Sequence, residues 1–200
     1  IINNKINYHM SIKSIVVFDF DGTLIKGDSI KLYCKWLSLN LFYFVLVYHF
    51  RFRLLKLFTS NFDLKHERVK YYHKKQLKKK LDINEFNSIL KDHLFKDSLA
   101  ILKSDQLNFE VYVVSASFSE IIKSFCLEFL KVNLLTNNIN DYNTLNDINF
   151  KNKIIALNSN IKKDYNIVKG YGNSSGDFNF MNISAQAFLR LPNGENIIWK

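Results

Sequence analysis

The sequence predicts an α/β fold: a Rossmann-like parallel sheet core flanked by helices, with a small helical cap inserted after the first strand. Short apolar runs rich in β-branched residues recur along the chain, and each ends at a polar or glycine-rich segment. Helical patterns lie between these runs, and strands that alternate with helices indicate right-handed βαβ units around a parallel sheet. A long aromatic and basic segment interrupts this alternation after the first run, which predicts the inserted cap.

The first expected strand covers Ile15 to Phe18, a continuous apolar run that ends at Asp19. A short run of this kind is typical of a strand buried on both faces of a parallel sheet. Three later runs have the same character and predict the remaining strands. They cover residues 111–114, which end at Ser115, residues 167–171, which end at Gly172, and residues 187–191.

Two helices are expected between these strands. Apolar residues at helical spacing mark one face of the first helix: Ile121, Ile122, Phe125, Phe129 and Leu130. Ser117 and Glu120 have the spacing of a capping box at its start. Residues 153–157 predict a shorter second helix.

The domain boundaries follow from this pattern. Residues 11–30 and 96–200 are expected to form the core, and residues 31–95 the helical cap. Residues 1–10 are expected to be a poorly ordered leader, with Met10 as the natural start of translation.

The cap contains an unusually apolar stretch, from Leu37 to Phe58, in which aromatic bulk is joined to basic residues. Three interpretations remain open: a helix buried within the cap, an interfacial helix on a membrane surface, and a membrane span. The stretch is too short, and too often interrupted by polar residues, for a typical membrane-spanning helix.

Composition restricts the partners. The formal net charge is +10, which favours anionic partners without choosing among phosphates, nucleic acid and anionic membranes. Lysines gather between Lys65 and Lys80, where they form either a solvated helix face or a patch that attracts an anionic substrate. Cys34 and Cys126 are isolated in apolar stretches and are expected to be buried free thiols.

Candidate functional residues stand at the ends of three expected strands, within residues 19–23, 115–117 and 172–177. Ligands of open parallel sheets bind at the carboxyl ends of the strands, so these segments should converge on one crevice. A carboxylate such as Asp19 at the end of a buried strand is costly unless it is paired or bound to metal. The set therefore predicts a phosphate-handling or metal site.

These segments resemble the four motifs of the haloacid dehalogenase superfamily, in order and across residues 11–190. Asp19-Phe20-Asp21-Gly22-Thr23-Leu24 resembles motif I, and Val113-Val114-Ser115-Ala116-Ser117 resembles motif II. Phe150-Lys151-Asn152-Lys153 is similar to the motif III region, and Gly172-Asn173-Ser174-Ser175-Gly176-Asp177 to motif IV. The helical insert resembles the cap of the phosphoserine-phosphatase-like branch, subfamily IB.

The resemblance implies a role for each motif I residue. Asp19 would attack phosphorus and form an aspartyl-phosphate, and Asp21 would act as general acid and then general base. Asp21 needs a raised pKa for this, which a neighbouring carboxylate in a closed site would supply. Gly22 would permit the tight turn, and Thr23 would orient Asp21 by a hydrogen bond and contribute to phosphate binding.

The other motifs would bind phosphate and metal. Ser115 and Ala116, with backbone N–H groups at the start of the next helix, would hold phosphate oxygens. Lys153 would neutralise phosphate and Asp19, with Lys151 as the alternative. Mg²⁺ would be bound by four residues: Asp19, Asp21, Asn173 and Asp177. Many members have aspartate where this chain has Asn173; the amide oxygen can still bind Mg²⁺, and a branch of the family resembles this chain here.

The sequence therefore predicts a Mg²⁺-dependent phosphomonoester hydrolase acting on a small or lipid phosphate. The alternatives are a phosphotransferase of the same superfamily and a non-catalytic protein, with a degenerate site, that binds anions or nucleic acid. No recognised nucleic-acid motif is present, so a nucleic-acid partner is not expected. A cytoplasmic location is expected, and the cap raises peripheral contact with the inner face of the membrane as an alternative.

Overall fold

The computed structural model describes residues 12–38, 40–58, 63–142, 147–149, 151–161 and 164–200. The predicted leader at residues 1–10 and Phe150 of the motif III region lie outside the described residues.

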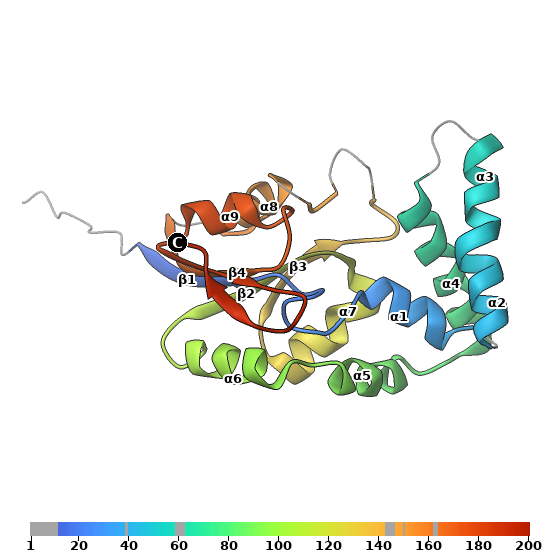
Figure 1. The fold of residues 1–200 in the computed structure, drawn as a ribbon, viewed down its shortest axis with the longest axis horizontal. Helices are drawn as coiled ribbons and strands as arrows, with labels where there is room; N and C mark the ends of the chain where they lie inside the picture. Colours follow the sequence, from blue (N-terminus) through green and yellow to red (C-terminus); the bar gives the residue numbers. More distant parts are fainter. Residues whose placement is uncertain (1–11, 39, 59–62, 143–146, 150, 162–163) are drawn as a thin grey trace, which may run out of the picture.

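A six-stranded sheet lies at the centre of the fold, in the order β3-β2-β1-β4-β5-β6 (Figure 1). Its strands are β1 (Lys13–Phe18), β2 (Glu110–Phe118), β3 (Asn133–Asn137), β4 (Tyr165–Gly172), β5 (Gln186–Arg190) and β6 (Asn196–Ile198). Strands β1 to β5 pair in parallel, and β6 pairs antiparallel with β5. The parallel sheet and its four predicted strands are confirmed.

Two strands were not predicted from the sequence. β3 is a five-residue edge strand with asparagine at both ends, and β6 has three exposed residues. Neither shows the long apolar run or the clean alternation that marks a strand in a sequence. Pairing with β2 and with β5 forms them.

Helices cover both faces of the sheet. Val16 and Phe18 face the layer formed by α6 (Lys96–Asp105), α7 (Ser119–Ser124) and the π-helical segment η2 (Phe125–Leu130). Ile15 and Val17 face the opposite layer, which contains α8 (Asn152–Asn160) and α9 (Phe178–Ile183). The predicted amphipathic helix is α7 with η2, and the predicted shorter helix is α8.

The capping box predicted at the start of α7 is wrong. Phe118 precedes the helix and makes no side-chain cap, while Ser117 still belongs to β2. Glu120 accepts a hydrogen bond from the backbone of Ile139 at 3.1 Å. The Ser117 hydroxyl is instead part of the crevice at the end of the sheet.

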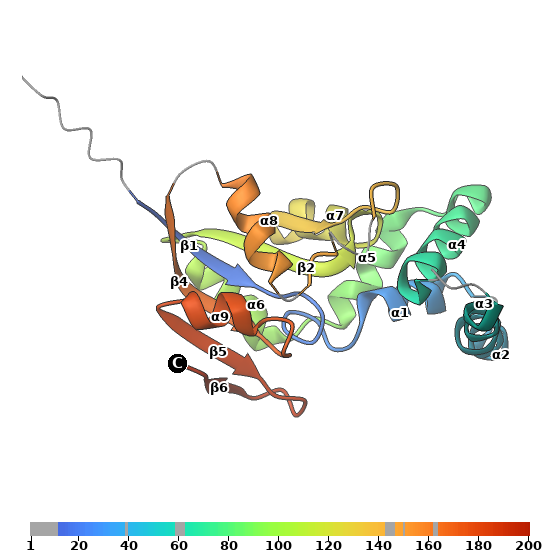
Figure 2. The ribbon, with the colours of Figure 1, turned by 90° about the horizontal axis from the view of Figure 1, so that it is seen from above.

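The inserted segment is helical, as predicted. It consists of α1 (Ser29–Trp36), α2 (Leu41–Val45), the π-helical segment η1 (Leu46–Arg51), α3 (Phe52–Phe58), α4 (Leu64–Lys79) and α5 (Ile83–Asp92). Figures 1 and 2 place α2, α3 and α4 at the end of the molecule opposite β5 and β6. Tyr33, Val69 and Phe86 of this segment belong to the same buried cluster as Val16 and Phe18, so the cap and the sheet share one core.

Segments α2, η1 and α3 follow one another without a break from Leu41 to Phe58. One side of this stretch is buried, through Phe44, Val47, Tyr48 and Phe52, while several large apolar side chains on the other side are exposed. The buried interpretation therefore holds for one side only. Within the described ranges, no helix is both long enough and apolar enough to cross a bilayer.

The two cysteines agree with their predicted state. Cys34 lies in α1 and Cys126 in η2, and both are buried free thiols.

Candidate functional site

The predicted strand ends meet at one edge of the sheet. Phe18, the last residue of β1, lies between Val113 of β2 and Tyr171 of β4. The backbone N–H of Asp19 donates to the carbonyl of Tyr171 at 2.8 Å, which fixes Asp19 directly beyond the strand. The carboxyl ends of three parallel strands therefore form one crevice, as the sequence predicts.

Asp19 belongs to a buried charge cluster centred on Lys153. Lys153 Nζ of α8 lies 2.5 Å from Asp19 Oδ1 and 2.6 Å from Asp177 Oδ1. All three residues are buried, with 6% of Asp19, 2% of Lys153 and 1% of Asp177 exposed. The cluster confirms that Lys153, rather than the exposed Lys151, contacts Asp19.

Thr23 does not orient Asp21 as predicted. Its hydroxyl donates to Asp19 Oδ2 at 3.2 Å. The Asp21 carboxylate is held by Ser29 at the start of α1, whose backbone N–H donates to Oδ1 at 2.7 Å and whose hydroxyl donates to Oδ2 at 3.0 Å. The two side chains point in different directions. The turn after β1 directs the Asp21 carboxylate toward the start of α1, whereas the Thr23 hydroxyl points toward Asp19.

A chain of hydroxyl groups connects Asp21 to the motif II segment. The hydroxyl of Ser29 lies 2.8 Å from that of Ser117, and the backbone N–H of Ser117 donates to Ser115 Oγ at 3.1 Å. α7 begins only at Ser119, so the predicted N–H groups at a helix start are not next to Ser115. Ser115 is buried, and Ala116 lines the cavity at Asp21.

The pKa values of the two motif I carboxyls are both raised. Loss of hydration and the charge of Asp177 raise the pKa of Asp19 to about 6, although Lys153 opposes the shift. Loss of hydration, then the charges of Asp28 and Asp19, raise the pKa of Asp21 to about 8. Asp19 therefore gives up its proton at a lower pH than Asp21, which makes Asp19 the candidate anion and Asp21 the candidate acid. This division suits a nucleophile beside a general acid.

The motif IV loop holds Asp177 firmly. Asp177 Oδ2 accepts hydrogen bonds from the backbone of Asn173 at 3.1 Å and from the backbone and hydroxyl of Ser174 at 3.0 Å each. The side chain of Asn173 packs against Gly22 of motif I. A Cβ atom on Gly22 would lie 2.0 Å from Asn173 Nδ2. The close approach of motifs I and IV therefore depends on glycine at position 22.

The predicted metal ligands are only partly grouped. Asp19 and Asp177 meet at Lys153, and Asn173 lies beside Gly22, but the Asp21 carboxylate is bonded to Ser29. Within the part of the chain that the structure describes, no cluster of three or more His, Cys, Asp or Glu side chains is arranged to hold a metal ion. The remaining donors are two carboxylates, an amide and main-chain carbonyls, whose oxygens suit Mg²⁺.

Replacing Gly22 by alanine is expected to destabilise the protein and displace Asn173. Gly22 has φ of +76°, and the added methyl group would also collide with the Asn173 amide. We expect the free energy of unfolding to fall by about 2 kcal/mol or more, measured by chemical denaturation.

Gly27→Ala is the matched control, because Gly27 has φ of +99° but no atom within 4 Å of its added Cβ. Gly27→Ala introduces the same kind of backbone strain at a positive φ but no collision with another side chain. Equal losses in the two variants would contradict the packing of Gly22 against Asn173.

A cavity of about 330 Å³ opens beside Asp21, between the sheet and the cap. Its lining comes from motif I, the start of α1, η1, α4, the end of β2 and the segment before α8: Asp21, Asp28, Ile30, Tyr48, Lys65, Arg68, Ala116 and Asn149. Lys65 is held by Asp147 at 3.0 Å. Arg68 lies over the Tyr48 ring at 4.1 Å, and its Nε is buried without a hydrogen-bond partner among the described residues. This cavity therefore combines an acid with cationic groups.

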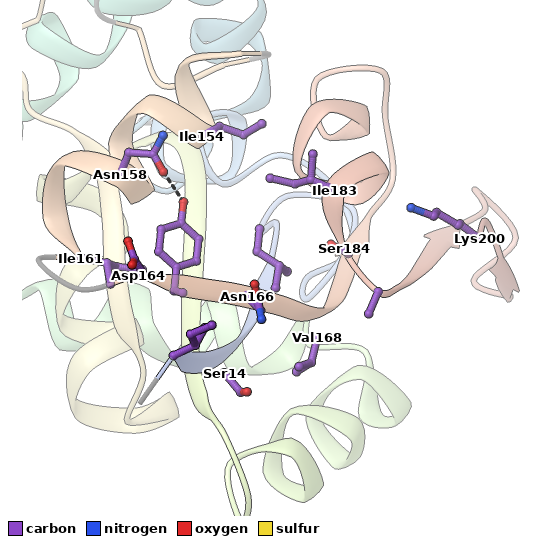
Figure 3. A pocket seen from close by; sticks show the side chains of 14 residues that line it. Ser14, Ile154, Asn158, Ile161, Asp164, Asn166, Val168, Ile183, Ser184 and Lys200 are labelled. Carbon is purple, nitrogen blue, oxygen red and sulfur yellow. Dashed lines mark hydrogen bonds between the residues drawn. The ribbon is translucent and has the colours of Figure 1, made fainter. Parts of the chain in front are cut away.

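A larger cavity, of about 1090 Å³, lies at the other end of the sheet (Figure 3). Ser14 of β1 and Asn166 of β4 line it at the amino ends of their strands, and Tyr165 there donates to Asn158 of α8. Asp19 and Gly172 lie at the opposite ends of these strands. Since ligands of parallel sheets bind at the carboxyl ends, the smaller cavity is the candidate site.

Several site residues were not predicted from the sequence: Asp28, Ser29, Tyr48, Lys65 and Arg68. Asp28 and Ser29 carried a usable signal, because Asp28 caps α1 by accepting from the Lys31 backbone and the pair marks a helix start just after motif I. Of the lysines between Lys65 and Lys80, Lys65 lines the cavity, while Lys74 and the last three are exposed. The interpretation as a solvated helix face holds for the exposed lysines, and the interpretation as a patch that attracts an anionic substrate stays a prediction.

The fold and the site define a parallel α/β protein with a buried aspartate directly after its first strand. The family model described as haloacid dehalogenase-like hydrolase matches residues 16–182, and the chain belongs to this family. None of the curated proteins matches the chain in sequence.

Solved structures share the fold. A protein of unknown function from Bordetella pertussis Tohama I is 11% identical, with a TM-score of 0.68 over 88% of this chain and 89% of that one. A phosphoserine phosphohydrolase-like protein from Francisella tularensis is 17% identical, with a TM-score of 0.53 over 88% of this chain and 86% of that one. At these identities the likeness concerns the fold alone.

Proposed function

We propose that this protein is a phosphomonoester hydrolase that uses Asp19 as its nucleophile and belongs to the phosphoserine-phosphatase-like branch of its family. The observation that carries the proposal is the cluster of Asp19, Lys153 and Asp177 beyond β1, two residues from Asp21, whose pKa is raised by burial. A buried carboxylate held by a lysine, with a second carboxyl group two residues away that can give up a proton, suits attack on a phosphate ester.

The proposed reaction has two steps. An Asp19 oxygen attacks phosphorus, the bond from phosphorus to the ester oxygen breaks, and Asp21 gives its proton to the leaving alcohol. Water then attacks phosphorus, the bond to Asp19 breaks, and Asp21 takes a proton back as inorganic phosphate leaves. Ser29 and Thr23 support these steps by holding the Asp21 and Asp19 carboxylates in place.

Mg²⁺ is the cofactor that this donor set fits. Asp19, Asp177, the amide oxygen of Asn173 and the main-chain carbonyl of Asp21 would hold it. When bound, it would supply positive charge against the repulsion between nucleophile and phosphate, which is about 4 kcal/mol for two unit charges at 4 Å and an effective dielectric constant of 20.

The substrate is proposed to be a small or lipid phosphate monoester that enters the cavity beside Asp21. Lys65 is ion-paired with Asp147, whereas no ion pair of Arg68 is found among the described residues. Arg68 is therefore the group that suits an anionic part of the substrate. Tyr48 and Ile30 offer apolar contact to its alcohol.

Arg68→Gln is expected to raise KM for a phosphate monoester about tenfold and to change kcat little. A charge-assisted hydrogen bond contributes about 1.5–3 kcal/mol, and Arg68 is placed to bind substrate rather than to take part in proton transfer. Steady-state kinetics measure both constants, and Lys74→Gln on the same helix, exposed and outside the cavity, is the control. An unchanged KM would remove Arg68 from the substrate site.

A phosphatase screen with and without Mg²⁺ tests the proposal directly. The panel should contain an aryl phosphate, phosphoserine and lipid phosphates in detergent. Release of inorganic phosphate to water supports a hydrolase, and transfer to an added alcohol or sugar phosphate would make the protein a phosphotransferase. If wild type and Asp19→Asn were equally inactive over the panel, the non-catalytic anion-binding alternative would replace the hydrolase.

A further inference from the structure

The stretch from α2 through η1 to α3 has two different sides. On the inner side, Tyr43 and Tyr71 of α4 share a hydrogen bond of 2.8 Å, the Phe52 ring lies 5.8 Å from the Tyr71 ring, and Arg68 covers Tyr48. These contacts anchor the stretch on α4. The outer side therefore has a fixed orientation relative to the rest of the molecule.

The outer side carries a continuous apolar stripe. Its residues follow one another at steps of three or four, which places them along one side of a helix. We call Phe42, Leu46, Phe50, Leu54 and Leu57 the outer stripe. Their exposed fractions are 76%, 48%, 62%, 55% and 77%, in that order. Five large apolar side chains exposed along one side of a helical stretch are typical of an interaction surface.

The charge beside the outer stripe is of one sign. Arg53 and Lys56 are exposed on the same stretch, and Arg51 lies over the Tyr71 ring. The sequence contains no aspartate or glutamate between Asp28 and Asp63. A partner for this surface must therefore accept large apolar side chains and offer negative charge.

We propose that the outer stripe lies on the surface of a lipid bilayer that contains anionic lipids. The stretch from Leu41 to Phe58 has 18 residues, so its length is about 27 Å at 1.5 Å per residue, and a helix of this kind lies flat with its apolar side among the acyl chains. Arg53 and Lys56 then contact lipid phosphates. The contact does not require phosphate hydrolysis.

Other occupants fit this surface less well. A symmetric contact with a second copy brings two basic stretches together, and the outer side has no carboxylate to pair with them. Nucleic acid offers negative charge but no apolar medium for Leu46 or Phe50. Figures 1 and 2 show that α2 and α3 stand at one end of the molecule, where a flat surface can approach them.

Vesicle flotation tests the proposal with the full chain. Vesicles of phosphatidylcholine with phosphatidylglycerol are compared with vesicles of phosphatidylcholine alone. The wild type is expected to bind the anionic vesicles, and Leu46→Glu is expected to bind them at least about tenfold more weakly, because one leucine is no longer buried and a charge is added. At about 1 M salt, where the screening length falls to about 3 Å, binding is expected to weaken.

Leu107→Glu is the matched control, since Leu107 is 82% exposed in the turn between α6 and β2. It should bind vesicles as the wild type does. A second variant, Arg53→Gln with Lys56→Gln, should lose the preference for anionic lipid while it keeps the apolar stripe. Circular dichroism shows whether each variant is folded.

Three results would overturn the proposal. The first is absence of wild-type binding to anionic vesicles, and the second is equal binding by wild type and folded Leu46→Glu. The third is a wild-type oligomer that Leu46→Glu converts to a monomer without any vesicle binding, which would assign the stripe to a second copy.

Discussion

Asp19→Asn is expected to lower the rate of phosphate ester hydrolysis by about 10⁴-fold or more. The amide keeps the shape of the side chain but lacks the anionic oxygen that would attack phosphorus. The kcat for an aryl phosphate, measured at saturating substrate and Mg²⁺, checks this value. Substrate binding should persist, because the cavity groups at Lys65 and Arg68 are unchanged.

Asp105→Asn is the matched control for this variant. Asp105 is also buried, with 3% exposed, and is also held by a lysine, since Lys169 Nζ lies 2.6 Å from its Oδ1. It is the last residue of α6, and its hydrogen bonds are to Lys169 and to the Tyr171 hydroxyl rather than to Asp19, Lys153 or Asp177 among the described residues. Comparable losses of activity in the two variants would mean that a general weakening of the fold, rather than the missing nucleophile, explains Asp19→Asn.

Lys153→Met is expected to lower both stability and activity. Its ammonium group lies between two buried carboxylates, so methionine leaves Asp19 and Asp177 facing each other without a counter-charge. Removing one partner from a buried ion pair costs about 3–5 kcal/mol, measured as the free energy of unfolding. The pKa of Asp19 should rise further, because Lys153 opposes its shift, and kcat should fall about 100-fold or more as the nucleophile becomes protonated.

The pH dependence of this loss has a defined sign. Protonation of Asp19 removes its repulsion with Asp177, and a raised carboxyl pKa favours the folded state as pH falls. The difference in stability between Lys153→Met and wild type should therefore shrink from about pH 8 to about pH 5. Lys151→Met is the control, since Lys151 is exposed two residues earlier, and it should change neither stability nor kcat. The opposite result, with Lys151→Met as the damaging change, would contradict the placement of the lysine.

Much of the fold could be predicted because a strand that is buried on both faces is apolar at nearly every position. Ile15 to Phe18 is apolar at every position, and the structure places it in the centre of the sheet, with layers on both faces. β3 and β6 lack such an apolar run, because they are short strands at the two edges of the sheet and each pairs on one side only. Runs of apolar residues in the sequence therefore predict the central strands of the sheet better than its edge strands.

The chemistry of the site was predicted where residues lie next to strand ends. Asp19 directly follows β1, where the parallel strands end at one edge of the sheet, and it meets Asp177 through Lys153 of α8, while Asp21 lines the cavity. The partners within the crevice were harder to predict. The hydrogen bond of Thr23 to Asp19, and that of Ser29 to Asp21, depend on the direction in which the turn after β1 leaves the sheet.

Residues from the cap were the least predictable part of the site. Arg68 and Tyr48 come from α4 and η1, and they line the same cavity as Asp21 and Ala116, which are distant from them in the sequence. No local pattern separates Arg68 from the basic residues around it in the sequence. The place of Arg68 and Tyr48 in the cavity depends on tertiary packing, which cannot be predicted from the spacing of residues along one helix.

Chemical trapping of the phosphorylated enzyme tests the central claim most directly. The protein is mixed with excess phosphate ester, quenched within one turnover and reduced with borohydride, which converts an aspartyl-phosphate into homoserine. Peptide mass spectrometry should find homoserine at position 19 alone, and the modification should be absent without substrate and in Asp19→Asn. Turnover with no modification at Asp19, or with phosphate on another residue, would contradict the proposed nucleophile.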